Sequence, residues 1–579
     1  MRPHWFPLCC SLLVSGGVAL TLLSPGPAAA CGGFFCDNVG GVPQPVDQTG
    51  ENILFVIDDV AGTVEAHIQI QYMGDPAKFA WVIPVTAVPD FSVGSELLFT
   101  NLLAGTVPSY SFTSVQDCQE RDRPDVGCMS EKGGRDDGAG NVTAGEFSDE
   151  GDTGPTIVKR EIVGAYEIVV LQGGTAQELY DWLDSNGYAQ DPDAPPILAQ
   201  YLDEGFYFAA ARLVHGAGVD ELQPLVMTYK GTQPCVPLRL TRIAAVADMP
   251  IRVFALAHAR SVPVGYRHVE INEARIDWAN TATNYMEVVR NAIDAPGADG
   301  RAFVTEYAGA DGVVSIDGLY DTRWDSTIFT DAQPLTGSYS VVDALTSQGV
   351  MECFEFDGCT YNHPLLLPIL RTYLPTPAGV GEDDFYACMS CFSDQIDPVA
   401  WNGPKFAQAL EERIFAPGKH ASELLARWSY LTRMLTIMSP EEMTSDPEFV
   451  QNPDLPDVLA ARSATQMVPC EGSNKMELPG GEAVLVAPDG SWPTFDDTMP
   501  WARQVQSTLP AGAPLVEQDF SEAITAAVRT SNKRYKYDNG GGLNCGVRRS
   551  GSSLIGALSL AFVMGFAWRR RRPRRSSKT

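Results

Sequence analysis

The last 35 residues constrain this chain most, because they decide on which side of a membrane the rest of it folds. An apolar run extends from Leu554 to Trp568, and four consecutive arginines, Arg569 to Arg572, follow it. As a helix this run is about 22 Å long. If the helix starts at Ser550, it is just long enough to span the ~30 Å hydrocarbon core. Because an arginine cluster stays on the cytoplasmic side, the sequence predicts a transmembrane helix with the preceding chain outside the cytoplasm.

The order of features in this tail is itself informative. Asn544-Cys545-Gly546 comes first, then the apolar run, then arginines as far as Arg575. This order resembles the C-terminal sorting signals of myxobacterial surface proteins, in which a membrane protease cuts near a cysteine. The resemblance covers residues 544–575 and implies that sorting machinery processes Cys545. The alternative is an uncleaved single-span anchor, and either outcome tethers the protein to the membrane or cell surface.

The first 30 residues have the composition of a secretory signal peptide, which the export machinery would remove. Apolar residues dominate positions 6–23, and three alanines ending at Ala30 precede Cys31. This pattern predicts cleavage after Ala30. Lipidation of Cys31 is the competing interpretation, but a lipobox has Leu or a similar residue where Ala28 stands.

The charge of the exported part excludes two classes of partner. The first 30 residues hold one basic residue and the last 35 hold nine, so the remainder carries 31 Lys and Arg against 72 Asp and Glu, about −41. A surface this acidic repels nucleic acid and anionic lipid. Solubility outside the cell is the simplest reason for it.

The cysteines predict disulfide bonds. Cys9 and Cys10 belong to the signal peptide and Cys545 to the tail, which leaves ten of the thirteen. An even number of cysteines in an exported chain is typical of a disulfide-bonded protein. Neighbours in sequence are the simplest pairs, although the connectivity stays open at this stage. The candidates are Cys31, Cys36, Cys118, Cys128, Cys235, Cys353, Cys359, Cys388, Cys391 and Cys470.

Residues 31–320 are predicted to form an α+β domain rich in antiparallel strands. In residues 63–72, Val64 and Ile68 lie on an apolar face, while His67 lies on a polar face where it is expected to be solvated. Strands outnumber helices and cluster, which favours α+β over a wound parallel sheet. The predicted strands are 52–60, 63–72, 78–85, 156–171, 206–214, 222–229, 236–244 and 251–258, and the predicted helices are 95–103, 175–186, 196–203 and 281–293.

Residues 116–155 differ from the sequence around them. They are rich in Asp, Glu and Gly, and they hold Cys118 and Cys128. This composition cannot bury a core, so it predicts a long loop that a disulfide pins. A calcium loop is the alternative, but the acidic residues lack the regular alternation of such a loop. Its ligands would be Asp136, Asp137, Asn141 and Asp149.

Four short segments carry a resemblance to a known family. They are Cys31-Gly32-Gly33-Phe34-Phe35-Cys36, Phe79-Ala80-Trp81-Val82-Ile83-Pro84-Val85, Ala176-Gln177-Glu178-Leu179-Tyr180-Asp181-Trp182-Leu183 and Pro237-Leu238-Arg239-Leu240-Thr241. With these segments, residues 31–320 resemble the DUF2330 family of exported bacterial proteins of unknown function. That family has no assigned chemistry, so the resemblance implies no catalytic residue.

Residues 321–530 are predicted to be mainly helical and stapled by disulfides. Apolar residues recur at helical spacing in residues 421–438, and Ser439 with Glu442 has the spacing of a capping box for a further helix. Residues 531–544 are polar and suited to a flexible tether. The predicted helices are 339–348, 363–374, 405–415, 421–438 and 521–530, and residues 466–509 are expected to be mostly loop with one strand at 482–487.

No motif identifies a catalytic, cofactor-binding or metal-binding residue. Cys353, Cys359, Cys388 and Cys391 together have the inventory of a zinc site, but an oxidising compartment favours disulfides between them. The seven histidines lie in no HExxH context, and no GxSxG, Walker or dinucleotide pattern occurs. The acidic pairs Asp383/Asp384 and Glu441/Glu442 are expected by chance in a chain with 72 carboxylates.

Two functions from different classes remain. One is a surface-anchored binding or structural protein of the cell envelope, with an envelope or extracellular partner. The other is an extracellular hydrolase whose carboxylates converge only in the folded chain. A cleft in which carboxylates or histidines converge would favour the hydrolase, whereas a head with shallow surfaces would favour binding.

Overall fold

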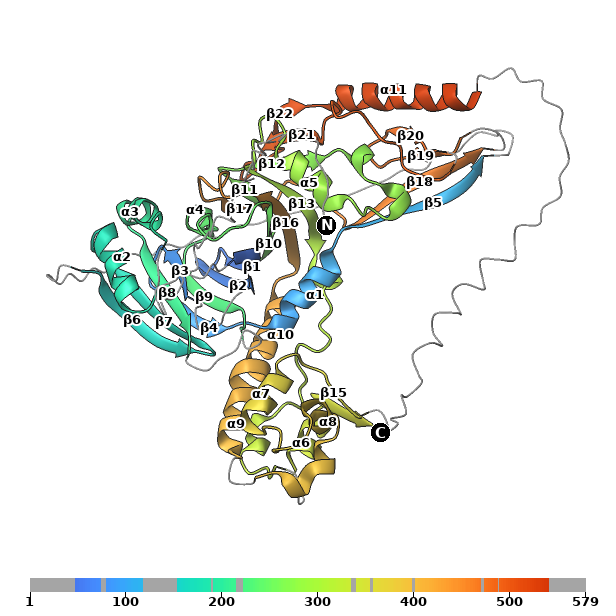
Figure 1. The fold of residues 1–579 in the computed structure, drawn as a ribbon. Coiled ribbons are helices and arrows are strands. Elements are labelled where there is room, and N and C mark those ends of the chain that lie inside the picture. The colour runs from blue at the N-terminus through green and yellow to red at the C-terminus, as the bar shows by residue number, and fades with distance from the viewer. Residues whose placement is uncertain are drawn as a thin grey trace, which may run out of the picture. The chain divides into compact units, whose positions relative to one another are not determined.

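The structure, a computed structural model, describes residues 47–73, 80–117, 154–188, 191–214, 222–334, 340–354, 358–397, 401–469, 473–487 and 489–540 (Figure 1). The predicted signal peptide, most of the predicted acidic loop and the C-terminal tail lie outside these residues. Ala30, Cys31, Cys36, Cys118, Cys128, Cys470 and Cys545 also lie outside them. Contacts divide the chain into two units, Met1–Asn532 and Lys533–Thr579, and the elements below belong to the first except for the end of the last helix.

A ten-stranded mixed sheet is the largest element of the fold. In spatial order its strands are β22 (Leu515–Asp519), β21 (Ala502–Ser507), β12 (Arg267–Ile271), β13 (Ala302–Ala310), β16 (Tyr430–Met438), β10 (Met249–Ala257), β1 (Asp47–Asp58), β2 (Thr63–Met73), β9 (Leu225–Lys230) and β4 (Asp90–Val93). β1 pairs in parallel with β10, and β12 pairs in parallel with β13, while the other neighbours are antiparallel. Since β16 lies between β13 and β10, the sheet combines strands from both sides of residue 320.

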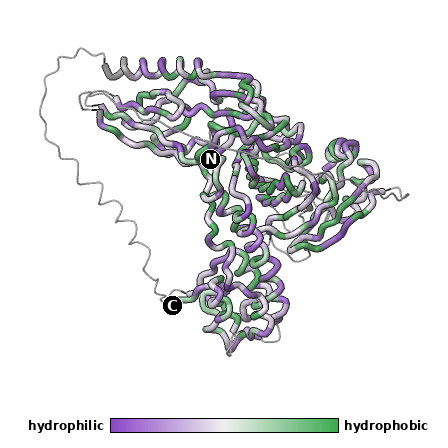
Figure 2. Tube along the Cα trace, turned by 180° about the vertical axis from the view of Figure 1, so that it is seen from behind, coloured by the Kyte–Doolittle hydropathy of each residue, from purple (hydrophilic) through white to green (hydrophobic). Residues whose placement is uncertain are grey.

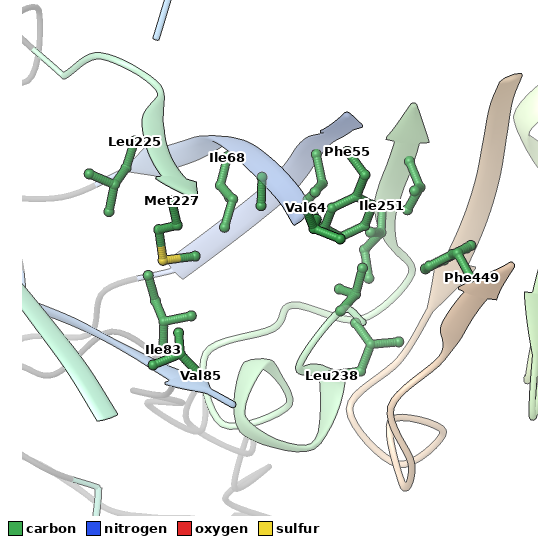
Figure 3. Close-up of a cluster of buried hydrophobic side chains, with 14 of the residues drawn as sticks. Phe55, Val64, Ile68, Ile83, Val85, Leu225, Met227, Leu238, Ile251 and Phe449 are labelled. Carbon is green, nitrogen blue, oxygen red and sulfur yellow. The ribbon is translucent and has the colours of Figure 1, made fainter. Parts of the chain in front are cut away.

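A second, antiparallel sheet packs against the first. Its order is β3 (Ala80–Val85), β8 (Tyr207–Leu213), β7 (Tyr166–Gln172) and β6 (Thr156–Val163). Ile83 and Val85 of β3 share a buried hydrophobic cluster with Ile68 and Met227 of the large sheet (Figure 3). The predicted mixture of strands and helices is therefore confirmed in this region.

Two helices cover the other face of the second sheet, α2 (Ala176–Ser185) and α3 (Ala194–Asp203). The predicted capping box is present: the backbone N–H of Glu178 donates to Thr175 Oγ1, and the backbone N–H of Thr175 donates to the Glu178 carboxylate. Both helices were predicted, because the signals that begin and end them are local.

The prediction of one strand at residues 156–171 is wrong. The chain forms a hairpin of β6 and β7, which turns at Gly164 with φ of 56°. Glycine reaches this left-handed conformation without the steric cost of a Cβ. A short turn between two strands of similar alternation leaves little trace in the hydrophobic pattern.

A third sheet has the order β20 (Ala483–Leu485), β19 (Lys475–Glu477), β18 (Ala461–Pro469) and β5 (Ser109–Asp117). β5 and β18 run parallel in register from Ser109 and Ala461. A hydrophobic cluster beneath them includes Trp278 and Ile524, the latter from α11 (Ser521–Gly540). The predicted strand at 482–487 is confirmed as β20, but β21 and the end of β18 lie in residues 466–509, which were expected to be mostly loop. Each of them pairs on one side with a strand that is distant in sequence, β5 or β12, and local patterns do not reveal such a partner.

The segment between β13 and β16 is mainly helical, as predicted. Its helices are α6 (Val341–Ser347), α7 (Leu366–Tyr373), α8 (Glu382–Ala387), α9 (Gly403–Leu410) and α10 (Ala416–Arg427), with a π-helical turn at Glu411–Phe415 joining the last two. A separate hydrophobic cluster fills it. Disulfides join Cys353 to Cys359, across the hairpin of β14 (Met351–Phe354) and β15 (Gly358–Tyr361), and Cys388 to Cys391.

The predicted helix at residues 421–438 is wrong from Tyr430 onward. Helix α10 ends at Arg427, and the chain continues as β16, an interior strand of the large sheet. Leu431 and Leu435 are both fully buried, and so are Met434 and Met438 on the other face. A strand buried on both faces has no two-residue alternation, so its apolar residues also fit helical spacing.

Two other predicted elements differ from the structure. Residues 236–244 form a helical turn, α4 (Leu238–Thr241), instead of a strand; Pro237 precedes it and cannot donate to a strand ladder. Ser439 to Glu442 form a turn instead of a helix. The Ser439 hydroxyl accepts from the backbone N–H of Asp248, 3.1 Å away, and so is engaged outside its own segment.

The expected solvation of His67 is also wrong, because His67 is only 1% exposed. The polar face of β2 is covered: the Gln69 amide donates to Glu96 of α1 (Glu96–Thr106), and His420 of α10 lies beside Glu65. The alternation in β2 was read correctly, but the helices on that face come from distant parts of the chain.

Among the helices of the described residues, none combines the length and apolar character needed to cross a bilayer. In Figure 2, polar residues recur along α11, the longest of them. The predicted transmembrane segment lies outside the residues that the structure describes.

Candidate functional site

A polar cleft of about 370 Å³ lies where the large sheet meets the third sheet. Strands β5, β12, β13, β18 and β21 contribute to its wall, together with β11 (Arg260–Val264), which pairs with β17 (Glu448–Asn452). Its ionisable and hydroxyl-bearing residues are Tyr110, Arg260, His268, Glu270, Glu273, Tyr285, Thr305, Arg462 and Arg503. The fold thus gathers in one cleft side chains from five separate parts of the sequence.

Arg260 is the most constrained cation of this cleft. Its side chain is buried, and one Nη donates to the carbonyl oxygen of Pro456 at 3.0 Å while the other donates to Thr305 Oγ1 at 3.1 Å. Its Nε is buried and has no partner among the described residues. Burial lowers the pKa of Arg260 from its usual 12.5, although arginine stays charged. A buried guanidinium with an unused donor is suited to an acceptor that enters the cleft.

The other two arginines lie partly exposed along the same wall. Arg503 donates to Glu482 Oε2 at 2.5 Å, and Arg462 acts on Glu273 and Tyr110 through its charge. Burial raises the pKa of Glu273 above 4.5, although a hydrogen bond from the backbone N–H of Gly480 and the charges of Arg462 and Arg503 oppose this rise.

His268 belongs to a hydrogen-bonded row along the cleft floor. Its Nδ1 lies 3.2 Å from Gln506 Oε1 and its Nε2 lies 3.0 Å from Thr305 Oγ1. Gln506 uses its amide nitrogen to donate to Glu270, so its oxygen accepts, and His268 therefore carries its proton on Nδ1. Burial lowers the pKa of His268 to about 4, which keeps the ring neutral at pH 7.

Two tyrosines close the inner end of the cleft. Tyr110 packs edge-on against Trp278, with ring centroids 5.1 Å apart, and lies 5.7 Å from the ring of Tyr285. The Tyr285 hydroxyl donates to Glu306 at 2.7 Å, and Glu306 accepts from Arg433 Nε at 2.5 Å. Burial raises the pKa of both tyrosines, so their hydroxyls stay protonated donors.

The lining combines three arginines with two glutamates, Glu270 and Glu273, and a neutral histidine. One of the arginines, Arg503, is already paired with Glu482. In a chain whose net charge is −31, such a gathering of guanidinium groups is unexpected on composition alone. Arginine can bind carboxylate and phosphate groups with two parallel hydrogen bonds, but both Nη atoms of Arg260 already donate to Pro456 and Thr305.

The predicted site residues lie elsewhere. The disulfides Cys353–Cys359 and Cys388–Cys391 are confirmed, so these four sulfurs are not available as zinc ligands. Cys235 is partly buried and carries a free thiol among the described residues, and burial raises its pKa to about 12. None of these cysteines lines the polar cleft.

Sequence reasoning missed the residues of the cleft. Arg260 and Arg503 are far apart in the chain, and no spacing or motif links them to Arg462. His268 lies in no recognised catalytic or metal-binding motif. Composition gives no usable signal, because it does not say which of the chain's 31 arginines converge.

The fold is that of a mixed α+β protein with a polar cleft. Residues 25–311 match DUF2330, a family described as an uncharacterized protein conserved in bacteria, and over these residues the chain belongs to that family. The match includes Arg260, His268 and Thr305, whereas Arg462 and Arg503 lie beyond it. None of the curated proteins matches the chain. No solved structure matches it either.

Proposed function

We propose that this protein is an exported, surface-anchored binding protein of the cell envelope, and that the polar cleft holds a small oxyanion. The signal-peptide and tail patterns support export and anchoring. The two disulfides are consistent with them, because disulfides persist in oxidising compartments. The binding proposal rests on one observation: the Nε of buried Arg260 has no hydrogen-bond partner among the described residues.

An oxyanion would remove the energetic cost of leaving Arg260 Nε buried without a hydrogen bond. A buried polar group without a hydrogen bond costs about 1–3 kcal/mol, and more when it is charged. A ligand oxygen that accepts from Arg260 Nε would remove this cost, and the partly exposed Arg462 would add a second charge. The ligand is therefore a small carboxylate or phosphate, two anions that share this recognition chemistry.

Calorimetric titration of the full chain with inorganic phosphate and, separately, with citrate tests the proposal. We expect one of them to bind once per chain, and Arg462→Gln to weaken that binding about tenfold or more. The matched control is Arg323→Gln, which removes an exposed arginine that pairs with Asp321 outside the cleft. If neither anion binds, or if the two variants weaken binding equally, the proposal is contradicted.

A second candidate is the hydrolase, which the cleft also favours. Glu273, with a raised pKa, could act as an acid, and Glu270 in the same lining could act as a base. Assays with p-nitrophenyl acetate and p-nitrophenyl β-glucoside test this function. Turnover that Glu273→Gln abolishes would establish it, and absence of turnover on both would leave binding as the better account.

The location is testable separately from the cleft. Mass spectrometry of the mature protein from fractionated cells should find Cys31 at the N-terminus in the envelope fraction. Processing near Cys545 would indicate sorting, and an intact tail would indicate a retained anchor. Recovery of the full chain from the cytoplasm with reduced thiols would contradict the proposed export.

A further inference from the structure

A cluster of one carboxylate and two imidazoles lies on the opposite side of β2 from the main core. Glu65 and His67 are two residues apart on β2, so their side chains share a face. His420, from α10, meets them there although it is 355 residues away from Glu65. Both histidine Nε2 atoms lie 2.6 Å from the same oxygen, Glu65 Oε1. The three ligand atoms lie within 4.8 Å of one another.

Hydrogen bonds within this cluster do not account for all of its polar atoms. His67 is 1% exposed, and among the described residues its Nδ1 has no partner. Gly94 lies beside this nitrogen: a Cβ on Gly94 would be 3.2 Å from His67 Nδ1. A side chain at position 94 would crowd this nitrogen, so the glycine permits the close approach, and the buried Nδ1 keeps an unused hydrogen-bonding capacity among the described residues.

We infer that Glu65, His67 and His420 form a zinc site. Two imidazoles and one carboxylate are a donor set that zinc takes in proteins, with ligand distances of about 2.0–2.2 Å. The present separations of 2.6 Å between ligand atoms require a modest outward movement to admit the ion, and the His420 side chain, 42% exposed, has the freedom to make it. The same exposure leaves a further coordination position open to water.

The site would hold two parts of the chain together. His420 lies at the end of the helical segment that separates β13 from β16, whereas Glu65 and His67 belong to the large sheet. Zinc bound here would link α10 to β2 across the polar face. Because binding requires both elements in place, zinc should stabilise the folded chain in proportion to its affinity.

Titration of the metal-depleted full chain with Zn²⁺ tests the inference. The background is Cys235→Ser, so that the free thiol does not compete. We expect one zinc per chain with a dissociation constant of about 1 μM or lower, and a melting temperature that rises with zinc. X-ray absorption should report two imidazole ligands. Magnesium should not bind at the same concentration, because it prefers oxygen ligands.

Two variants separate the site from adventitious binding. His420→Ala removes a partly exposed ligand and should weaken zinc binding by more than about a hundredfold, with the melting temperature of the metal-free chain little changed. The matched control, His258→Ala, removes an exposed histidine that pairs with Asp59 and should leave zinc binding intact. Absence of stoichiometric binding to the parent chain, or equal affinity in His420→Ala, would overturn the inference. Loss of binding in both variants would overturn it as well.

Discussion

Arg260 donates a hydrogen bond to Thr305 Oγ1 at 3.1 Å, while the Nε of the same guanidinium is buried without a partner in the described part of the chain. Thr305 also lies 3.0 Å from His268 Nε2. Because His268 Nε2 is an acceptor, the Thr305 hydroxyl donates to the histidine and accepts from the arginine. The hydroxyl thus helps to fix Arg260 in one orientation, in which its Nε is buried.

Replacing Arg260 should therefore affect binding more than stability. Arg260→Met removes two hydrogen bonds, which destabilises the folded chain. It also removes a buried charge without a full set of partners, which stabilises the folded chain, so the two effects offset each other. We expect the free energy of unfolding to change by less than about 1 kcal/mol and phosphate or citrate binding to disappear. Urea unfolding and calorimetry on the same sample measure both. A loss of several kcal/mol would show that Arg260 is mainly structural.

Arg433 should behave in the opposite way. It is 4% exposed, pairs with Glu306 at 2.5 Å and also donates to the hydroxyl of Thr106. Arg433→Met leaves the Glu306 carboxylate buried without its cation, which costs about 3–5 kcal/mol. Urea unfolding measures this loss. The double variant with Glu306→Gln should recover part of it, and no recovery would contradict the ion-pair explanation.

His268 predicts a pH dependence of stability. Its pKa is about 4 in the folded chain and about 6.5 when unfolded, so the unfolded chain binds more protons between these values. The resulting stability is present above pH 6.5 and is lost as the pH falls through 4, by at most about 3.4 kcal/mol. His268→Gln should flatten the fall in unfolding free energy over this window. Burial also lowers the pKa of His363 to about 4. His363 therefore contributes a similar dependence of unfolding free energy on pH, which remains in His268→Gln. An unchanged slope in His268→Gln would contradict the assignment of a buried neutral ring.

The disulfides should stabilise the helical segment in particular. Cys353–Cys359 closes a loop with a sequence separation of 6, for which the chain-entropy estimate is about 2 kcal/mol. We expect the Cys353→Ser/Cys359→Ser variant to lower the free energy of unfolding by about this amount. Hydrogen exchange should become faster around β14 and β15, whereas α2 should keep its protection. Faster exchange in α2 alone would contradict this localisation.

The sequence was sufficient where structure depends on neighbours in the chain. Helix α2 follows from Thr175 and Glu178, which cap it, and the first hairpin of the large sheet follows from the alternation in β2. β16 was misread because its two faces are both buried, which makes an interior strand resemble a buried helix. Local patterns report periodicity, but they do not report how many faces of an element are covered.

The two candidate sites could not be predicted for the same reason. His67 was expected to be solvated, but the fold buries it, and His420 of α10 lies on the same Glu65 carboxylate. Arg260 and Arg462 meet because β11 and β18 lie beside one cleft, a consequence of pairings between distant segments. Alternation, caps and turn signals do not predict which distant side chains will lie in one site.

The most direct test of the central claim is a crystal structure of the protein with phosphate or citrate, whichever binds more tightly in solution. The account predicts that the anion lies in the polar cleft with an oxygen within hydrogen-bond distance of Arg260 Nε, and that Arg462 turns toward it. An anion bound only at exposed arginines such as Arg323, with the cleft filled by water alone, would contradict the account.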